Sequence, residues 1–355
     1  MNHTPLVLST KAFLRKAYRP FEVVQEAWLA ARAPHNPELF ASLYRTAQQK
    51  AREPRLGFSA YLRDYPPIGE IAIATDWSHD QHEYLRLHYS STLFGEGTIR
   101  ARIDGESQHV LIFLPGYYVG AEKVLRDTSH PQYLVDLASD LKFSLVTWTW
   151  PLQENRGDRG LFSGMKSTVS IEREYARILP TFGTSLWREM VAELDFALSN
   201  IARLFDRGQT LHIVGWSMGG AFAYFAPLLC SRVQKVVSAG SCARIIDLLQ
   251  TARTRVHSFY FYPHDSLRYF DLDDIVAEVL GKDVELHIIY GEHDQGCLET
   301  SSNALIARAA ENRGLALRIL PSHGHHFSTE LKRCIADSLT SFINSRCMPR
   351  RQTGC

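Results

Sequence analysis

The sequence has few cysteines and no long apolar run, and these absences exclude several classes of protein. No stretch approaches the roughly 18 consecutive apolar residues of a membrane span, and Met1–Pro20 lacks the apolar core of a secretory signal. The cysteines stand singly, without a Cys-x-x-Cys pair, which argues against a disulfide framework or a zinc site. The sequence therefore predicts a cytoplasmic protein without a membrane span. The cysteines are Cys230, Cys242, Cys297, Cys334, Cys347 and Cys355.

The sequence also has no marked excess of positive or negative charge. The chain of 355 residues carries 39 Lys and Arg against 38 Asp and Glu, a formal net charge of +1. These charges are scattered along the sequence, so nothing indicates a nucleic-acid partner. With 45% hydrophobic residues, the chain has ample material for a globular core.

Residues 1–68 differ from the rest and predict a helical N-terminal extension. Apolar residues from Phe21 to Ala31 recur at helical spacing, and Asn36-Pro37 opens a second amphipathic helix. The extension either packs on the rest of the chain and adds stability, or it provides a dimer contact or a partial cover over a site. A homodimer is therefore one open arrangement, and residues 347–355 are expected to be a frayed tail.

Residues 69–346 alternate between short apolar strands and amphipathic helices. This alternation predicts an α/β domain with a mostly parallel central sheet that is covered by helices on both faces. The expected strands are 70–75, 83–89, 98–103, 110–114, 143–149, the run from Leu211, 235–238, 285–290 and 315–320; the expected helices include 132–141, 189–205 and 329–343.

The stretch from Leu211 to Gly220 organises the domain. An apolar strand stops at Gly215, and a helical pattern begins just after Met218. Gly-x-Ser-x-Gly at such a junction predicts a nucleophile elbow, in which a strained turn raises the Ser217 hydroxyl above the carboxyl end of the sheet. Gly215 and Gly219 remove side chains that would collide in that turn.

An activated serine needs a base within hydrogen-bond reach and an acid to orient that base. Asp294 follows one predicted strand and is the expected acid, with Glu292 as the alternative. The last strand is followed by three histidines, any of which is a candidate base: His323, His325 and His326.

With the order Ser, Asp, His, the chain resembles an α/β-hydrolase from about Gly69 to Ile343. The resemblance rests on Gly-Trp-Ser-Met-Gly-Gly, Gly-Glu-His-Asp and Gly-His-His-Phe. It implies a triad of Ser217, Asp294 and His325, because the base of the family commonly follows a glycine. It also implies that the backbone N–H groups of Tyr117 and Met218 form an oxyanion hole, although Pro115 stands where the family usually has histidine.

A substrate pocket is expected around the elbow. Gly116, Tyr118 and Trp216 are its predicted lining, and a short lid is expected at about 242–284, where the family inserts one. The lid segment carries an aromatic cluster that either lines an apolar pocket or packs as ordinary core. The cluster consists of Phe259, Tyr260, Phe261, Tyr262, Tyr269 and Phe270.

These features favour a serine hydrolase that cleaves a carboxylic ester or thioester of a small-molecule acyl substrate. Two alternatives stay open: an acyltransferase resembling homoserine O-acetyltransferases, and a non-catalytic binding protein that keeps the pocket but not the chemistry. No metal, nucleotide or flavin signature appears in the sequence, so no cofactor is implied.

Overall fold

The computed structural model describes residues 54–80, 84–116, 119–151, 174–241, 268–294, 308, 311 and 314–347. Contacts within the chain divide it into two units, Met1–Arg52 and Glu53–Cys355. All described residues belong to the second unit. The expected N-terminal helices, Tyr117, Tyr118, the tail and lid residues 242–267 lie outside the described residues.

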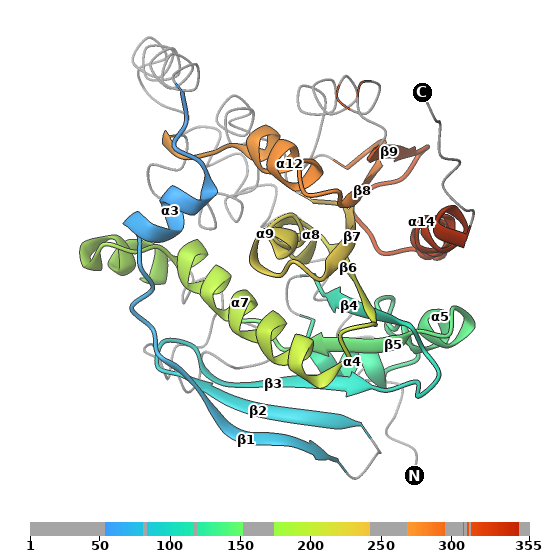
Figure 1. Ribbon diagram of the computed structural model, residues 1–355, viewed down its shortest axis with the longest axis horizontal. Helices are drawn as coiled ribbons and strands as arrows, with labels where there is room; N and C mark the ends of the chain where they lie inside the picture. Colours follow the sequence, from blue (N-terminus) through green and yellow to red (C-terminus); the bar gives the residue numbers. More distant parts are fainter. Residues whose placement is uncertain are drawn as a thin grey trace, which may run out of the picture. The chain divides into compact units, whose positions relative to one another are not determined.

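Within the described residues, nine strands form one sheet (Figure 1). Their spatial order is β1-β2-β3-β5-β4-β6-β7-β8-β9. Pairing is antiparallel from β1 to β5 and parallel in every pair from β5 to β9. The strands are β1 (Ile71–His79), β2 (Leu85–Ser91), β3 (Gly95–Arg102), β4 (His109–Leu114), β5 (Ser144–Trp148), β6 (Thr210–Trp216), β7 (Val233–Ala239), β8 (Glu285–Gly291) and β9 (Leu315–Leu320).

Helices cover both faces of this sheet (Figure 1). One face packs against α3 (Phe58–Asp64), α7 (Leu186–Leu204), α8 (Met218–Ala223), α9 (Ala226–Leu229) and α12 (Leu272–Leu280), with the 3-10 turn η2 (Leu179–Phe182) before α7. The other face packs against α4 (Ala121–Leu125), α5 (Val135–Asp140) and α14 (Thr329–Cys347). The prediction of a mostly parallel sheet between two helical layers is therefore confirmed.

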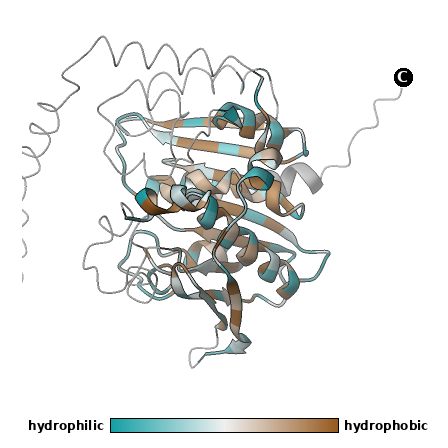
Figure 2. Ribbon diagram, turned by 90° about the vertical axis from the view of Figure 1, so that its left-hand side faces the viewer, coloured by the Kyte–Doolittle hydropathy of each residue, from teal (hydrophilic) through white to brown (hydrophobic). Residues whose placement is uncertain are grey.

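The central strands are rich in apolar residues because both of their faces are covered. In β4, Val110 and Ile112 belong to one core, whereas Leu111 and Phe113 belong to the other. Figure 2 shows hydrophobic residues, in brown, along the strands. The edge strand β1 contrasts with them, since most of its residues are exposed.

Helix α3 places the beginning of the domain earlier than the sequence predicted. Phe58 and Tyr61 are fully buried in the core that contains α7, and the Tyr61 hydroxyl lies 3.0 Å from the Ser185 Oγ. Residues 54–68 were expected in the N-terminal extension. Because their aromatic side chains complete the core beneath α7, they belong to the same unit as the sheet.

Helix α12 packs one of its faces into the core. Its apolar side chains Ile275, Val276 and Val279 are buried. Asp271 is 1% exposed and caps the helix in a reciprocal capping box with Asp274. The adjacent Tyr269 and Phe270 are also buried in the core, so these two aromatic residues pack as core rather than line a pocket.

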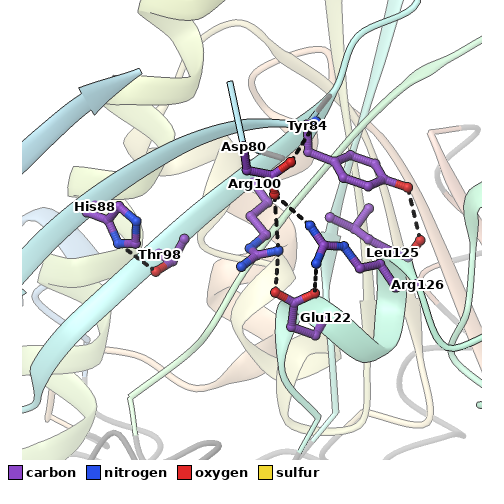
Figure 3. Close-up of polar contacts among 8 residues, drawn as sticks. All are labelled: Asp80, Tyr84, His88, Thr98, Arg100, Glu122, Leu125 and Arg126. Carbon is purple, nitrogen blue, oxygen red and sulfur yellow. Dashed lines mark hydrogen bonds and ion pairs between the residues drawn. The ribbon is translucent and has the colours of Figure 1, made fainter. Parts of the chain in front are cut away.

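Helix α4 follows the loop that contains Tyr117, and a cluster of charged side chains holds it to the sheet (Figure 3). Asp80 accepts from Arg126 at 2.6 Å and lies 3.5 Å from Arg100, while Glu122 pairs with both arginines. The Tyr84 hydroxyl donates to the Leu125 carbonyl at 3.3 Å. The side chains of Asp80 and Arg100 are mostly buried, so water weakens the attraction between their charges less than it does in an ion pair on the surface.

Candidate active site

The turn after β6 places a serine at the carboxyl edge of the sheet. Ser217 has φ 54° and ψ −116°, a backbone conformation that costs energy for any residue with a side chain. Its N–H donates to the Ala239 carbonyl at 2.8 Å, which fixes the turn against β7. Helix α8 begins at the next residue. The expected strand, strained turn and helix are all present.

Two glycines allow this turn because their neighbours leave no room for a side chain. A Cβ on Gly215 would lie 2.3 Å from the Gly219 carbonyl oxygen, and one on Gly219 would lie 2.0 Å from the Leu114 carbonyl oxygen. Real Cβ contacts do not come that close. The predicted steric reason for both glycines is therefore confirmed.

Three side chains form one hydrogen-bonded row at this edge. The Ser217 Oγ lies 2.9 Å from His325 Nε2, and His325 Nδ1 lies 2.9 Å from Asp294 Oδ2. Asp294 is 1% exposed, whereas the His325 side chain is 47% exposed. A buried carboxylate that accepts from Nδ1 leaves Nε2 free to accept from a serine hydroxyl, the arrangement that makes a serine nucleophilic.

The competing candidates make other contacts. His323 is buried, and its Nε2 lies 2.8 Å from the Ser328 Oγ; His326 stacks on His323 with ring centroids 4.1 Å apart. The exposed Glu292 accepts from the Ser322 N–H at 2.7 Å. The structure therefore brings His325 and Asp294 to the serine, and it uses His323 and Glu292 to shape the loop that carries the imidazole.

Trp216 and Gly116 lie beside this row. Trp216 is 6% exposed, and its indole stacks on the His325 ring with centroids 4.9 Å apart. The Gly116 N–H donates to Gln132 Oε1 at 3.0 Å. Tyr118, the third residue of the predicted pocket lining, is outside the described part of the chain.

Gln132 is a residue of this region that the sequence analysis missed. It is 7% exposed, and its own N–H donates to His130 Nδ1 at 3.2 Å. Burial lowers the pKa of His130, which favours the neutral ring that can accept this bond. Gln132 thus holds the loop directly before Tyr117, whose N–H is the predicted oxyanion donor. No motif around Gln132 signals this contact.

The other predicted donor lies at the start of α8. Met218 is the first residue of that helix, so its N–H belongs to the first turn, where amides have no intrahelical acceptor. Among the described residues, no group of three or more His, Cys, Asp or Glu side chains could hold a metal ion. In the same residues, no helix is both long and apolar enough to cross a membrane.

Comparison with known proteins gives structural likeness only. No family model and no curated protein matches the chain. The solved structure of TT1662 from Thermus thermophilus is 17% identical, with a TM-score of 0.47, over 77% of this chain and 98% of that one. The esterase Pf2001 from Pyrococcus furiosus is 13% identical, with a TM-score of 0.46, over 81% of this chain and 98% of that one.

The S-formylglutathione hydrolase FrmB from Staphylococcus aureus is 14% identical, with a TM-score of 0.44, over 79% of this chain and 99% of that one. Similarity at this level assigns no activity to the chain. The chain's own geometry is more specific. Its serine sits on a strained strand-to-helix turn above a parallel sheet, and the aspartate and histidine that approach it follow in that order. The chain has the α/β-hydrolase fold.

Proposed function

We propose that the protein is a serine hydrolase that cleaves a carboxylic ester or thioester through an acyl-enzyme on Ser217. The observation that carries this proposal is the row of Ser217, His325 and Asp294 at a strained turn, with both distances at 2.9 Å. A serine that only capped a helix would not require a buried carboxylate behind a histidine.

The mechanism follows from the direction of these hydrogen bonds. His325 Nε2 takes the hydroxyl proton as the Ser217 Oγ attacks the acyl carbon, and Asp294 stabilises the imidazolium that forms. The imidazolium then gives the proton to the departing alcohol or thiol, which leaves an ester between the acyl group and Ser217. Water attacks this ester with His325 as base, the acid departs, and the serine regains its proton.

Negative charge develops on the acyl oxygen in both steps. We assign its stabilisation to the backbone N–H groups of Met218 and Tyr117, as the resemblance implies. A single donor of this kind is worth about 10² to 10³ in rate. Gly116 and Tyr118 stay predicted lining of the acyl pocket, and a small-molecule acyl compound is the proposed substrate.

Experiments distinguish this proposal from two alternatives. In an acyltransferase related to homoserine O-acetyltransferases, the acyl-enzyme would pass its acyl group to an alcohol or amine faster than to water. In a non-catalytic binding protein, the serine would stay unreactive. The hydrogen-bonded row favours catalysis, because a binding protein has no need for a base on its serine. Cytoplasmic location and a homodimer stay predictions.

The test is hydrolysis of p-nitrophenyl esters from acetyl to palmitoyl by the wild type and by Ser217→Ala. We expect turnover with an optimum of chain length in the wild type and none in the variant. A fluorophosphonate probe should label the wild type at Ser217 only. Added alcohol or amine acceptors measure transfer against hydrolysis. A folded wild type that neither turns over an ester nor takes the probe would refute the proposal and support the binding protein.

A further inference from the structure

Trp216, the residue directly before the nucleophile, packs its indole into the core on the α14 face of the sheet. The residue is 6% exposed. It stacks on the His325 ring at 4.9 Å between centroids with 26° between the planes. The ring thus lies mainly against the imidazole rather than in open solvent.

The surrounding residues hold the indole in a narrow slot. A Cβ on Gly116 would lie 2.6 Å from the indole, and one on Gly240 would lie 2.4 Å from it. The Phe327 ring meets the indole edge-on, with centroids 5.4 Å apart and 85° between planes. Since backbone without side chains closes both sides, the indole has little freedom to rotate away.

The stack restrains a motion that the hydrogen bonds leave free. The bonds from Nδ1 to Asp294 and from Nε2 to Ser217 fix two points of the imidazole. A ring held at two points can still rock about the line that joins them, which turns the Nε2 lone pair away from the serine hydroxyl. A rigid surface against one face limits this rocking. The imidazole needs such support because its side chain is 47% exposed.

The indole also interacts with the positive charge that His325 acquires during the reaction. During acyl transfer the imidazole becomes an imidazolium, and a cation within about 6 Å of an indole centroid is attracted to the face of the ring. The attraction is absent while the imidazole is neutral. It therefore stabilises the transition state more than the ground state, which is the condition for raising kcat rather than lowering KM.

We propose that Trp216 is a positioning residue that holds the imidazole of His325 in line with Ser217 and favours its protonated form during acyl transfer. This inference rests on the proposed serine chemistry, and it gives Trp216 a different task from the pocket lining predicted from the sequence. Because Trp216 and Ser217 are adjacent in β6 and the elbow, one short piece of backbone places both the nucleophile and the support of its base.

Kinetics of matched variants test the role. Trp216→Leu keeps an apolar side chain but removes the aromatic face, and we expect kcat to fall about 2- to 30-fold with KM within about twofold. Trp216→Phe keeps an aromatic face and should recover most of kcat. The control is Trp187→Leu, since Trp187 is similarly buried, at 4% exposure, in the core on the opposite face. It should lower stability and leave kcat of the folded enzyme unchanged.

Fluorescence tests the stack without requiring activity. An imidazole that stacks on an indole changes the emission of that indole, so His325→Gln should change the tryptophan emission spectrum measured at one pH. The same substitution made in a Trp216→Phe background should leave the spectrum unchanged. Asp294, the carboxylate in contact with this imidazole, is present in all of these proteins.

Several results would overturn the inference. One is a Trp216→Leu enzyme with unchanged kcat and a raised KM, which would make the indole a substrate contact. Another is an emission spectrum of His325→Gln that superimposes on that of the wild type. If Trp216→Leu fails to fold, Trp216→Phe and the emission spectra still decide. If Ser217 proves unreactive, the proposed function fails. Tryptophan emission that His325→Gln leaves unchanged refutes the stack, whether or not Ser217 reacts.

Discussion

Lys235 and Glu285 offer a sharp test of how the sheet is held together away from the elbow. They pair in register near the starts of β7 and β8, and Lys235 Nζ donates to Glu285 Oε1 at 2.6 Å. The Lys235 side chain is fully buried, and Glu285 is 28% exposed. Burial would raise the pKa of Glu285, but hydrogen bonds from His287 and Lys235 outweigh it and lower that pKa to about 2.

We predict that Glu285→Gln destabilises the protein by about 2–4 kcal/mol at pH 7. Removing one partner of a buried pair costs about 3–5 kcal/mol, and the partial exposure of Glu285 reduces this value. The double variant Lys235→Met with Glu285→Gln removes the buried ammonium as well. It should therefore lose less free energy of unfolding than Glu285→Gln alone, because an apolar side chain needs no carboxylate.

The effect depends on pH with a definite sign. The folded pKa of about 2 lies below the unfolded value of about 4.3 for glutamate, so the carboxylate stabilises the fold above pH 4.3 and loses this contribution as the pH falls toward 2. The difference between wild type and Glu285→Gln should be about 1 kcal/mol smaller at pH 3.5 than at pH 7. Urea unfolding at the two pH values measures it. A cost below about 0.5 kcal/mol at pH 7, or a difference that does not shrink in acid, would refute the reasoning.

Further predictions concern the site. Gly219→Ala puts a Cβ 2.0 Å from the Leu114 carbonyl, so fluorophosphonate labelling should fall at least about 100-fold; Gly208→Ala, with open space around it, should label normally. Asp294→Asn should lower kcat about 10⁴-fold in a folded protein, as measured by ester hydrolysis, and Glu292→Gln should stay near wild type. His325→Gln should abolish turnover, whereas His323→Gln should keep it and lose about 1 kcal/mol of stability in a urea melt. Gln132→Leu frees the loop before Tyr117 and should lower kcat about 10-fold or more with little change in KM; a rise in KM alone would contradict that role.

The sequence predicted secondary structure correctly wherever the pattern of apolar residues reflects burial. Runs of mostly apolar residues predicted β4 and β6, because strands covered on both faces bury nearly every side chain. The elbow was also predictable, since the tight turn requires residues without side chains at Gly215 and Gly219, and both lie within two residues of Ser217.

Contacts between distant segments were not predictable in the same way. The residues alone left three histidines as candidates, and the resemblance favoured His325. The loop after β9 brings His325 to the serine. The contact of Gln132 with Gly116 joins two loops through one hydrogen bond, which leaves no periodic trace. Phe58 and Tyr61 were assigned to an extension because the alternation of strands and helices begins only at residue 69, whereas their packing beneath α7 places them in the domain.

The serine and its base are carried by strands at different places in the sheet, so thermal motion can move one without the other. Ser217 follows β6 near the middle of the sheet, whereas His325 follows β9, the edge strand three positions away, or about 14 Å at the usual spacing of strands (Figure 1). Edge elements open more readily than central ones. A brief detachment of β9 would carry the imidazole away while the elbow after β6 stayed in place. Loss of activity on warming should therefore precede global unfolding, and amide hydrogens of β9 should exchange before those of β6.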